Sequence, residues 1–221
     1  MREVIDGVFE IRLGYVNVHL VVTDDGLVLI DTGLPGRAPA IERALHGIRR
    51  SLGEVRTVLV THHHPDHVGS LAEVKRRSGA RLVAHAADAP HITGAFPAAP
   101  PAGVLGKLVS RLIGTVEPTK LDQLVGDGAE PLPGFTALHT PGHTRGHLSF
   151  LLDRDGGILF AGDAAGSRGG KVGPPPGPVT ADPAEARESL KRLAGEQFTH
   201  AVFGHGRAVT GRAVEAFRAA L

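Results

Sequence analysis

The sequence of 221 residues predicts an α/β fold in four layers, with two sheets inside and helices outside. Runs with strand character are followed by runs with helical spacing, and the same order then occurs a second time. Two such halves are expected to pack sheet against sheet, with helices on the outer faces. A chain of this length buries a core without disulfide bonds, and this one contains no cysteine.

The first half is predicted to start with a β-hairpin. Residues 16–22 and 27–30 have strand character, and the Asp25-Gly26 pair between them favours a tight turn. The elements predicted after it are a helix over 38–50, a buried strand over 55–60, a helix over 66–78 and a strand over 81–84. Residues 94–118 are expected to leave this core, with an amphipathic helix over 104–113.

The second half repeats the alternation. The predicted elements are strands over 121–125, 135–139, 148–152 and 157–161, a Gly/Pro-rich loop over 166–178, a helix over 183–194, a strand over 200–203 and a helix over 211–220. We expect residues 1–221 to form a single domain, because the candidate metal ligands described below come from both halves.

Composition and charge favour a soluble protein that acts on a small molecule. The 24 basic and 23 acidic residues leave a net charge of +1, which is not the basic footprint of a nucleic-acid-binding protein. No apolar run reaches the roughly 18–20 residues of a membrane span. Charges near Met1 argue against a signal peptide, so the expected location is the cytoplasm.

Histidines gather where the strand over 55–60 meets the helix over 66–78. The stretch Thr61-His62-His63-His64-Pro65-Asp66-His67 contains four of the 13 histidines. In an extended segment side chains two positions apart point the same way, so His62 and His64 are expected to bind one ion together. Asp66 and His67 begin the helix and face a second ion. The alternative is a polar loop that is rich in histidine by chance.

Nitrogen and oxygen ligands without sulfur suit zinc, and also iron, manganese or nickel. A hydrolytic site keeps one coordination position open for water, which four ligands on one ion would close. Two ions about 3.5–4 Å apart solve this, so we expect two zinc ions, with iron or manganese as alternatives.

This stretch resembles the HxHxDH motif of the metallo-β-lactamase superfamily. Thr140-Pro141-Gly142-His143-Thr144-Arg145-Gly146-His147 is similar to a second motif of that family. Further resemblances are Ile30-Asp31-Thr32-Gly33, Gly162-Asp163 and Gly204-His205-Gly206. Together the motifs span residues 31–206 and imply the four-layer αββα metallo-β-lactamase fold.

The resemblance implies a role for each matching residue. The first metal would be bound by His62, His64 and His143, the second by Asp66, His67 and His205, with Asp163 bridging both. Asp31 would hydrogen-bond a ligand histidine and fix its tautomer. His147 either supports the metal ligands or simply begins the strand over 148–152.

The implied activity is that of a dinuclear hydrolase, in which metal-bound hydroxide attacks an ester, thioester or lactone carbonyl and Asp66 takes or relays a proton. The chain ends soon after His205, which we interpret as the lack of the domain that binds glutathione in glyoxalase II. The alternatives are a β-lactam hydrolase and an oxidoreductase similar to the mononuclear iron persulfide dioxygenases.

Two segments outside the motifs are candidates for the substrate pocket. The apolar stripe within 94–118 is expected to form a lid, to cover the core or to make a homodimer contact. Arg168 and Lys171 either bind an acidic group of the substrate or are simply solvated. His63 is expected next to the ligands or in solvent. The histidines without motif support are expected to have structural or surface positions: His19, His46, His85, His91, His139 and His200.

Overall fold

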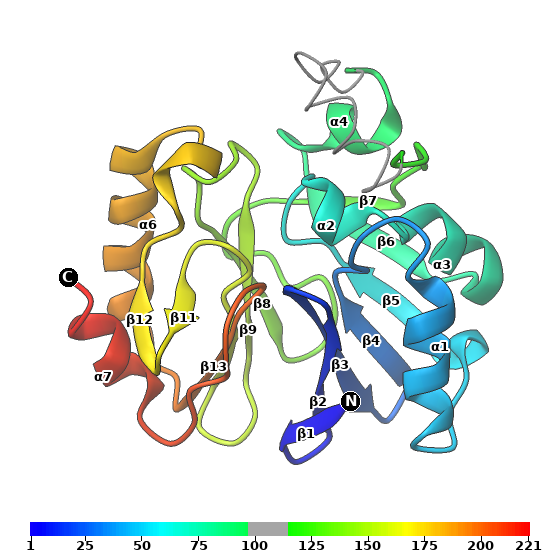
Figure 1. Cartoon of the computed structure of the whole chain (residues 1–221), viewed down its shortest axis with the longest axis horizontal. Helices are drawn as coiled ribbons and strands as arrows, with labels where there is room; N and C mark the ends of the chain where they lie inside the picture. Colours follow the sequence, from blue (N-terminus) through cyan, green and yellow to red (C-terminus); the bar gives the residue numbers. More distant parts are fainter. Residues whose placement is uncertain (97–114) are drawn as a thin grey trace. The chain divides into compact units, whose positions relative to one another are not determined.

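The computed structural model describes residues 1–96 and 115–221, and it contains both sheets and helices, as expected of an α/β fold (Figure 1). The chain divides into two compact units. The first unit comprises Met1–Val83 and Ala89–Gln123, and the second comprises Ala84–Asp88 and Leu124–Leu221. That residues 1–221 form one domain stays a prediction.

The first sheet has seven strands, β1 to β7, in sequence order, and most of its residues belong to the first unit. The strands are β1 (Arg2–Ile5), β2 (Val8–Leu13), β3 (Val16–Thr23), β4 (Gly26–Ile30), β5 (Val55–Leu59), β6 (Arg81–His85) and β7 (Gln123–Val125). The strands from β1 to β4 pair antiparallel, and β4, β5 and β6 pair parallel. The division between the two units falls within β6 and β7.

The helices of the first unit bury one apolar face each. They are α1 (Ala38–His46), the 3-10 helix η1 (Leu52–Glu54), α2 (Pro65–Val68), α3 (Leu71–Ser78) and α4 (Ala89–Thr93). In α1 the buried side chains include Ile41 and Leu45, and in α3 they include Leu71 and Val74. These pairs lie three or four positions apart, which places each pair on one side of its helix.

The single helix expected over 66–78 is divided in two, and the cause is a tertiary contact. The carbonyl of His67 accepts hydrogen bonds from the backbone N–H and the hydroxyl of Thr32, at 2.8 and 3.0 Å. A Cβ on Gly69 would lie 2.2 Å from the nitrogen of Pro35, so a glycine is needed where this loop passes. The helix therefore ends at Val68 and restarts at Leu71.

The second unit contains a four-stranded sheet in the order β13-β10-β9-β8. Its strands are β8 (Phe135–His139), β9 (Leu148–Leu152), β10 (Ile158–Phe160) and β13 (His200–Val202). A separate hairpin pairs β11 (Gly166–Arg168) with β12 (Lys171–Gly173), and a 3-10 helix, η2 (Gly177–Val179), follows it. The helices are α6 (Pro183–Ala194) and α7 (Ala213–Arg218).

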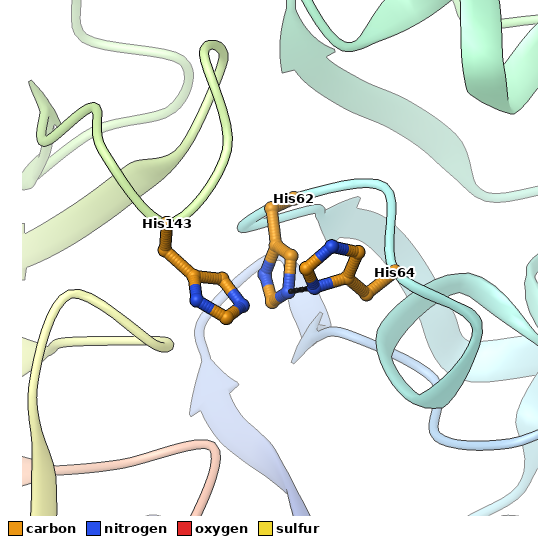
Figure 2. Close-up of side chains that lie close together, drawn as sticks. All are labelled: His62, His64 and His143. Atoms are coloured by element: carbon orange, nitrogen blue, oxygen red, sulfur yellow. Dashed lines mark hydrogen bonds between the residues drawn. The ribbon is translucent and has the colours of Figure 1, made fainter. Parts of the chain in front are cut away.

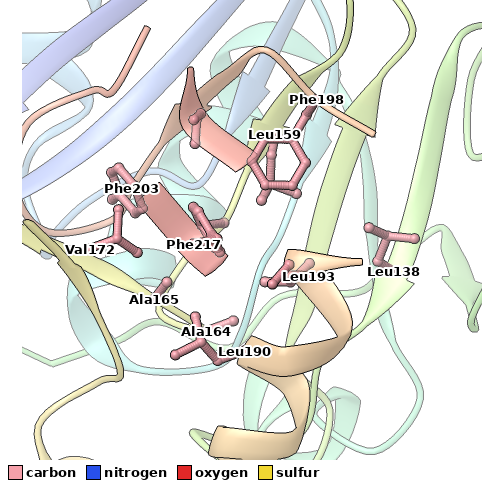
Figure 3. Close-up of a cluster of buried hydrophobic side chains, with 14 residues drawn as sticks. Leu138, Leu159, Ala164, Ala165, Val172, Leu190, Leu193, Phe198, Phe203 and Phe217 are labelled. Carbon is pink, nitrogen blue, oxygen red and sulfur yellow. The ribbon is translucent and has the colours of Figure 1, made fainter. Parts of the chain in front are cut away.

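An apolar core fills the second unit between its sheet and its two helices (Figure 3). Phe217 of α7 lies at its centre, with ring centroids 5.1 Å from Phe198 and 6.0 Å from Phe203. Leu190 and Leu193 of α6 close it from the other helix. This core keeps β10 and β13 side by side, and the loops that follow these two strands carry candidate metal ligands.

Most predicted elements are confirmed, some with shorter bounds. The predictions for β8, β9 and α6 match in full, whereas the helices expected over 38–50 and 211–220 cover only Ala38–His46 and Ala213–Arg218. The prediction of a loop over 166–178 was wrong in part, because this segment contains the β11–β12 hairpin.

Four elements outside the 166–178 segment were not predicted, namely β1, β2, η1 and α4. The helix expected over 104–113 lies outside the described residues. Within the described residues, no helix has the length and apolar character that crossing a membrane requires.

Candidate metal centre

His62 and His64 lie in the extended segment between β5 and α2. Thr61 and His62 are buried, and His64 is half-buried. The Nε2 atom of His62 lies 3.0 Å from the Nδ1 atom of His64, and Figure 2 shows the two nitrogens turned toward each other. Two imidazole nitrogens this close share either one proton or one metal ion.

The buried carboxylate of Asp31 is hydrogen-bonded to this histidine segment. It follows β4 directly, and its two oxygens accept hydrogen bonds from the backbone N–H of Thr61 (2.8 Å), the Thr61 hydroxyl (2.7 Å) and Nδ1 of His67 (2.7 Å). The hydroxyl proton of Thr61 goes to Asp31, so its oxygen accepts from Nδ1 of His62 at 3.0 Å. One carboxylate thus fixes the tautomers of two histidines, with the proton of each ring on Nδ1.

The backbone of Asp31 is strained, with a φ of 64°. Few residues other than glycine adopt a positive φ, and those that do often lie at functional sites. This conformation turns the chain sharply after β4, so the carboxylate points back to Thr61 while Thr32 reaches the carbonyl of His67. The strain at Asp31 therefore positions both ends of the histidine segment.

Asp66 lies beside the outward nitrogen of His67. Its Oδ2 is 3.9 Å from Nε2 of His67, and its side chain is partly exposed whereas that of His67 is buried. The ring of His67 also lies close to that of His62, with centroids 4.0 Å apart. The first unit thus places four nitrogen and oxygen donors within a six-residue segment.

A second group of donors surrounds Asp163 in the second unit. Its Oδ2 lies 3.4 Å from Nε2 of His143 and 3.3 Å from Nε2 of His205. Asp163 and His205 follow the parallel neighbours β10 and β13, so the sheet brings their loops together, and the N–H of Gly204 donates to the carbonyl of Gly162 at 3.0 Å. His143 lies on the loop after β8 (Figure 2).

His147 is buried and forms a hydrogen bond with the backbone of Asp163. Its Nε2 accepts from the backbone N–H of Asp163 at 2.9 Å, and its Nδ1 lies 2.8 Å from the hydroxyl of Thr140. Ser149 donates to the carbonyl of Ala161, so Thr140 donates to Ser149 and accepts from His147. The chain of donors leaves a single arrangement, in which His147 is neutral and carries its proton on Nδ1.

Two glycines let neighbouring segments approach the ligand loops closely. A Cβ on Gly142 would lie 2.2 Å from the nitrogen of Ala186 in α6, and one on Gly206 would lie 2.0 Å from the carbonyl oxygen of Ser167 in β11. Both glycines have a positive φ, of 121° and 109°. The loops of His143 and His205 are therefore packed against α6 and the β11–β12 hairpin.

The remaining histidines have other surroundings. The ring of His63 stacks on that of His91 with centroids 4.1 Å apart, and His85 stacks on His139 at 4.3 Å. His19 is buried in β3, and burial, followed by the neighbouring His67, lowers its pKa to about 3. His46 is exposed, as expected of a surface residue, and His200 is half-buried.

Arg168 and Lys171 form a cross-strand pair at the tip of the β11–β12 hairpin, and both are exposed. Their proposed role in binding an acidic group stays a prediction, as does the lid role of residues 94–118.

The distances within both groups suit divalent metal binding. Two ligand atoms of one tetrahedral zinc ion lie about 3.3–3.5 Å apart, given bonds of about 2.0–2.2 Å. The corresponding pairs are 3.0 Å for His62 and His64, 3.4 Å for His143 and Asp163, and 3.3 Å for His205 and Asp163. All seven candidate ligands belong to groups of histidine and aspartate side chains able to hold a metal ion.

Sequence reasoning named these seven candidate ligands but missed the groups that orient some of them. Thr61, Thr140 and Ser149 fix histidine tautomers through hydroxyl groups. Thr61 and Thr140 are the first residues of the two histidine-containing stretches, which was a usable signal. Ser149 carried none, because a serine inside a strand is ordinarily read as part of its surface alternation.

Comparison with known proteins gives one family. The model of the metallo-β-lactamase superfamily matches residues 11–205. A probable metallo-hydrolase of Bacillus subtilis, YflN, is 30% identical over 236 residues, covering 95% of this chain and 88% of that protein. A hydroxyacylglutathione hydrolase of Nitrobacter winogradskyi is 33% identical over 153 residues, covering 67% of this chain and 51% of that protein.

Two solved structures with the same fold are metallo-β-lactamases. A HARLDQ-motif mutant of the enzyme from Cronobacter sakazakii has a TM-score of 0.72 and 25% identity, covering 92% of this chain and 79% of that chain. The Rm3 metallo-β-lactamase has a TM-score of 0.74 and 24% identity, covering 97% and 88%.

Proposed function

We propose a reaction for this chain on the premise that it belongs to the metallo-β-lactamase superfamily. It has the metallo-β-lactamase fold, an α/β fold, and it is a hydrolase of this superfamily with histidine and aspartate side chains able to bind metal. We propose further that it is a dinuclear zinc enzyme that cleaves an ester, thioester or lactone.

In this proposal seven side chains bind two metal ions. His62, His64 and His143 hold the first ion, and Asp66, His67 and His205 hold the second. Asp163 bridges the two. The donor set has no sulfur and contains more ligands than one open tetrahedral site accepts, which favours two ions.

The observation that carries the proposal is the position of Asp163. A single carboxylate oxygen lies 3.4 Å from His143 and 3.3 Å from His205, and these histidines belong to different proposed metal sites. Both distances equal the separation expected of two ligands on one ion. A bridging carboxylate between two ligand sets would have this geometry.

When bound, two such ions polarise a carbonyl and lower the pKa of a water molecule toward 7. The residues of the chain orient the ligands and accept the proton. Asp31 and Thr61 keep Nε2 of His62 and His67 unprotonated, and His147 fixes the loop of Asp163. Asp66, partly exposed beside His67, is placed to accept a proton from the attacking water.

Relatives favour a carbonyl substrate. The hydroxyacylglutathione hydrolases that match this chain act, by their name, on a thioester, and the chain spans 51% of the Nitrobacter winogradskyi protein. The metallo-β-lactamase at 25% identity makes a β-lactam a second candidate. Hydrolysis of a thioester and hydrolysis of a β-lactam share the step in which water attacks a carbonyl.

The test is metal content by mass spectrometry of protein purified without added metal, followed by turnover of an ester, a lactone, a thioester and a β-lactam. We expect two zinc ions per chain and hydrolysis of a carbonyl substrate that Asp66→Asn abolishes. The exposed His46→Ala is the control and retains full turnover. A preparation with one iron and no zinc would instead indicate an oxidoreductase.

A further inference from the structure

Asp88 is a buried carboxylate that belongs to none of the sequence motifs. It lies between β6 and α4, and its side chain is part of the second unit's interior, with 2% of its surface exposed. Its Oδ2 accepts from the hydroxyl of Thr144 and its Oδ1 from the backbone N–H of Gly146, both at 2.8 Å. Thr144 directly follows the candidate ligand His143.

The loop that contains Thr144 and Gly146 is packed closely against Asp88. A Cβ on Gly146 would lie 2.6 Å from both the backbone nitrogen and Oδ1 of Asp88, so the two backbones touch at this point. On its other side the loop is tied to the start of α6, where the N–H groups of Ala181 and Asp182 donate to the carbonyls of His143 and Gly142 at 3.2 and 2.8 Å.

We propose that Asp88 is a positioning residue for metal binding, which fixes the direction of the His143 side chain through Thr144 and Gly146. This inference rests on the proposed function, because it requires His143 to be a ligand. Hydrogen bonds to a buried, charged acceptor are stronger than those between neutral groups, so the carboxylate holds the loop more rigidly than the backbone bonds on the α6 side.

The chemistry of the acceptor gives a graded set of variants. Asp88→Ala removes both hydrogen bonds. Asp88→Asn retains an oxygen for Gly146, and its NH₂ group donates to the Thr144 hydroxyl once that hydroxyl rotates. Thr144→Val removes one hydrogen bond and keeps the side-chain volume, so combined with Asp88→Ala it adds no further loss.

The experiment measures zinc affinity by competition with a chelator, together with the unfolding midpoint of the metal-free protein. We expect Asp88→Ala to weaken zinc binding by about 10–100-fold at the site that contains His143, as removal of a ligand-supporting residue does. Asp88→Asn should restore affinity to within about threefold of the wild type, a readout that a general loss of packing would not produce.

Two further variants separate the possible failures. Asp122→Ala removes the hydrogen bonds to Leu82 and Lys75, which anchor β6 in the first unit, and should lower the unfolding midpoint but leave zinc affinity unchanged.

His143→Ala should lose one zinc site. If Asp88→Ala binds both zinc ions with wild-type affinity while His143→Ala does not, the positioning role is refuted and the metal assignment stands. If His143→Ala also keeps both ions, the ligand assignment fails and the positioning role fails with it. A wild type that binds two zinc ions but turns over none of the four substrates refutes only the proposed reaction.

Discussion

Replacing Asp31 by asparagine turns one acceptor oxygen into an NH₂ donor. This changes which groups donate and which accept next to the candidate metal ligand His67. The carboxylate accepts three hydrogen bonds, of 2.8 Å from Thr61 N, 2.7 Å from Thr61 Oγ1 and 2.7 Å from His67 Nδ1. An amide has one oxygen, and its NH₂ group must face either the N–H of Thr61 or Nδ1 of His67. The first choice brings two donors together, so the second is expected.

In the second arrangement Nδ1 of His67 becomes an acceptor, and the proton of the neutral ring moves to Nε2. His67 then no longer presents a lone pair on Nε2. Loss of such a supporting residue weakens metal binding by about 10–100-fold, which corresponds to about 1.4–2.8 kcal/mol. The folded protein should also lose about 1.5–3 kcal/mol of stability, because a buried hydrogen bond to a charged group is lost.

The assay is zinc titration with a competing chelator, with nitrogen chemical shifts of the histidine rings as a direct readout of the tautomer. The control is Asp155→Asn. Asp155 also has a positive φ, of 53°, but its side chain is exposed in the turn before β10, so this variant separates backbone conformation from hydrogen bonding. If Asp31→Asn retains wild-type affinity for two zinc ions, the claim that Asp31 sets the tautomer is refuted.

Four other substitutions have distinct expected outcomes. Asp163→Asn should lower metal content and reduce turnover at least tenfold, since it removes the bridging charge, whereas His63→Ala should change neither by more than about twofold. Phe217→Ala should lower the free energy of unfolding in urea by about 3–5 kcal/mol, because the ring is fully buried. Gly142→Ala should disturb the loop of His143 and lower zinc affinity, because the new Cβ would lie 2.2 Å from the nitrogen of Ala186. Unchanged zinc affinity in this last variant would show that the loop tolerates displacement.

The sequence predicted the features that depend on neighbouring residues. The strand before His62, the side-by-side direction of His62 and His64, and the helix start at Pro65 all follow from local backbone geometry. The extent of α6 was also predictable, because Asp182 caps it with hydrogen bonds to the N–H groups of Ala184 and Glu185.

Features that depend on distant residues were beyond local patterns. The break after Val68 results from hydrogen bonds with Thr32, 35 positions from His67 along the chain. Asp88 and Thr144 are 56 positions apart, so no spacing rule links them. The β11–β12 hairpin was different, because Gly169 and Gly170 both have a positive φ and such a glycine pair is a recognised hairpin signal.

The measurement that tests the central claim most directly is anomalous X-ray diffraction from crystals of the metal-loaded protein, with data collected at the zinc and iron edges. The proposal predicts two zinc peaks about 3.5–4 Å apart. Each peak should be bonded to histidine nitrogens, with Asp163 bonded to both peaks. A single peak, an iron signal without zinc, or two peaks without a bond to Asp163 would contradict the dinuclear site.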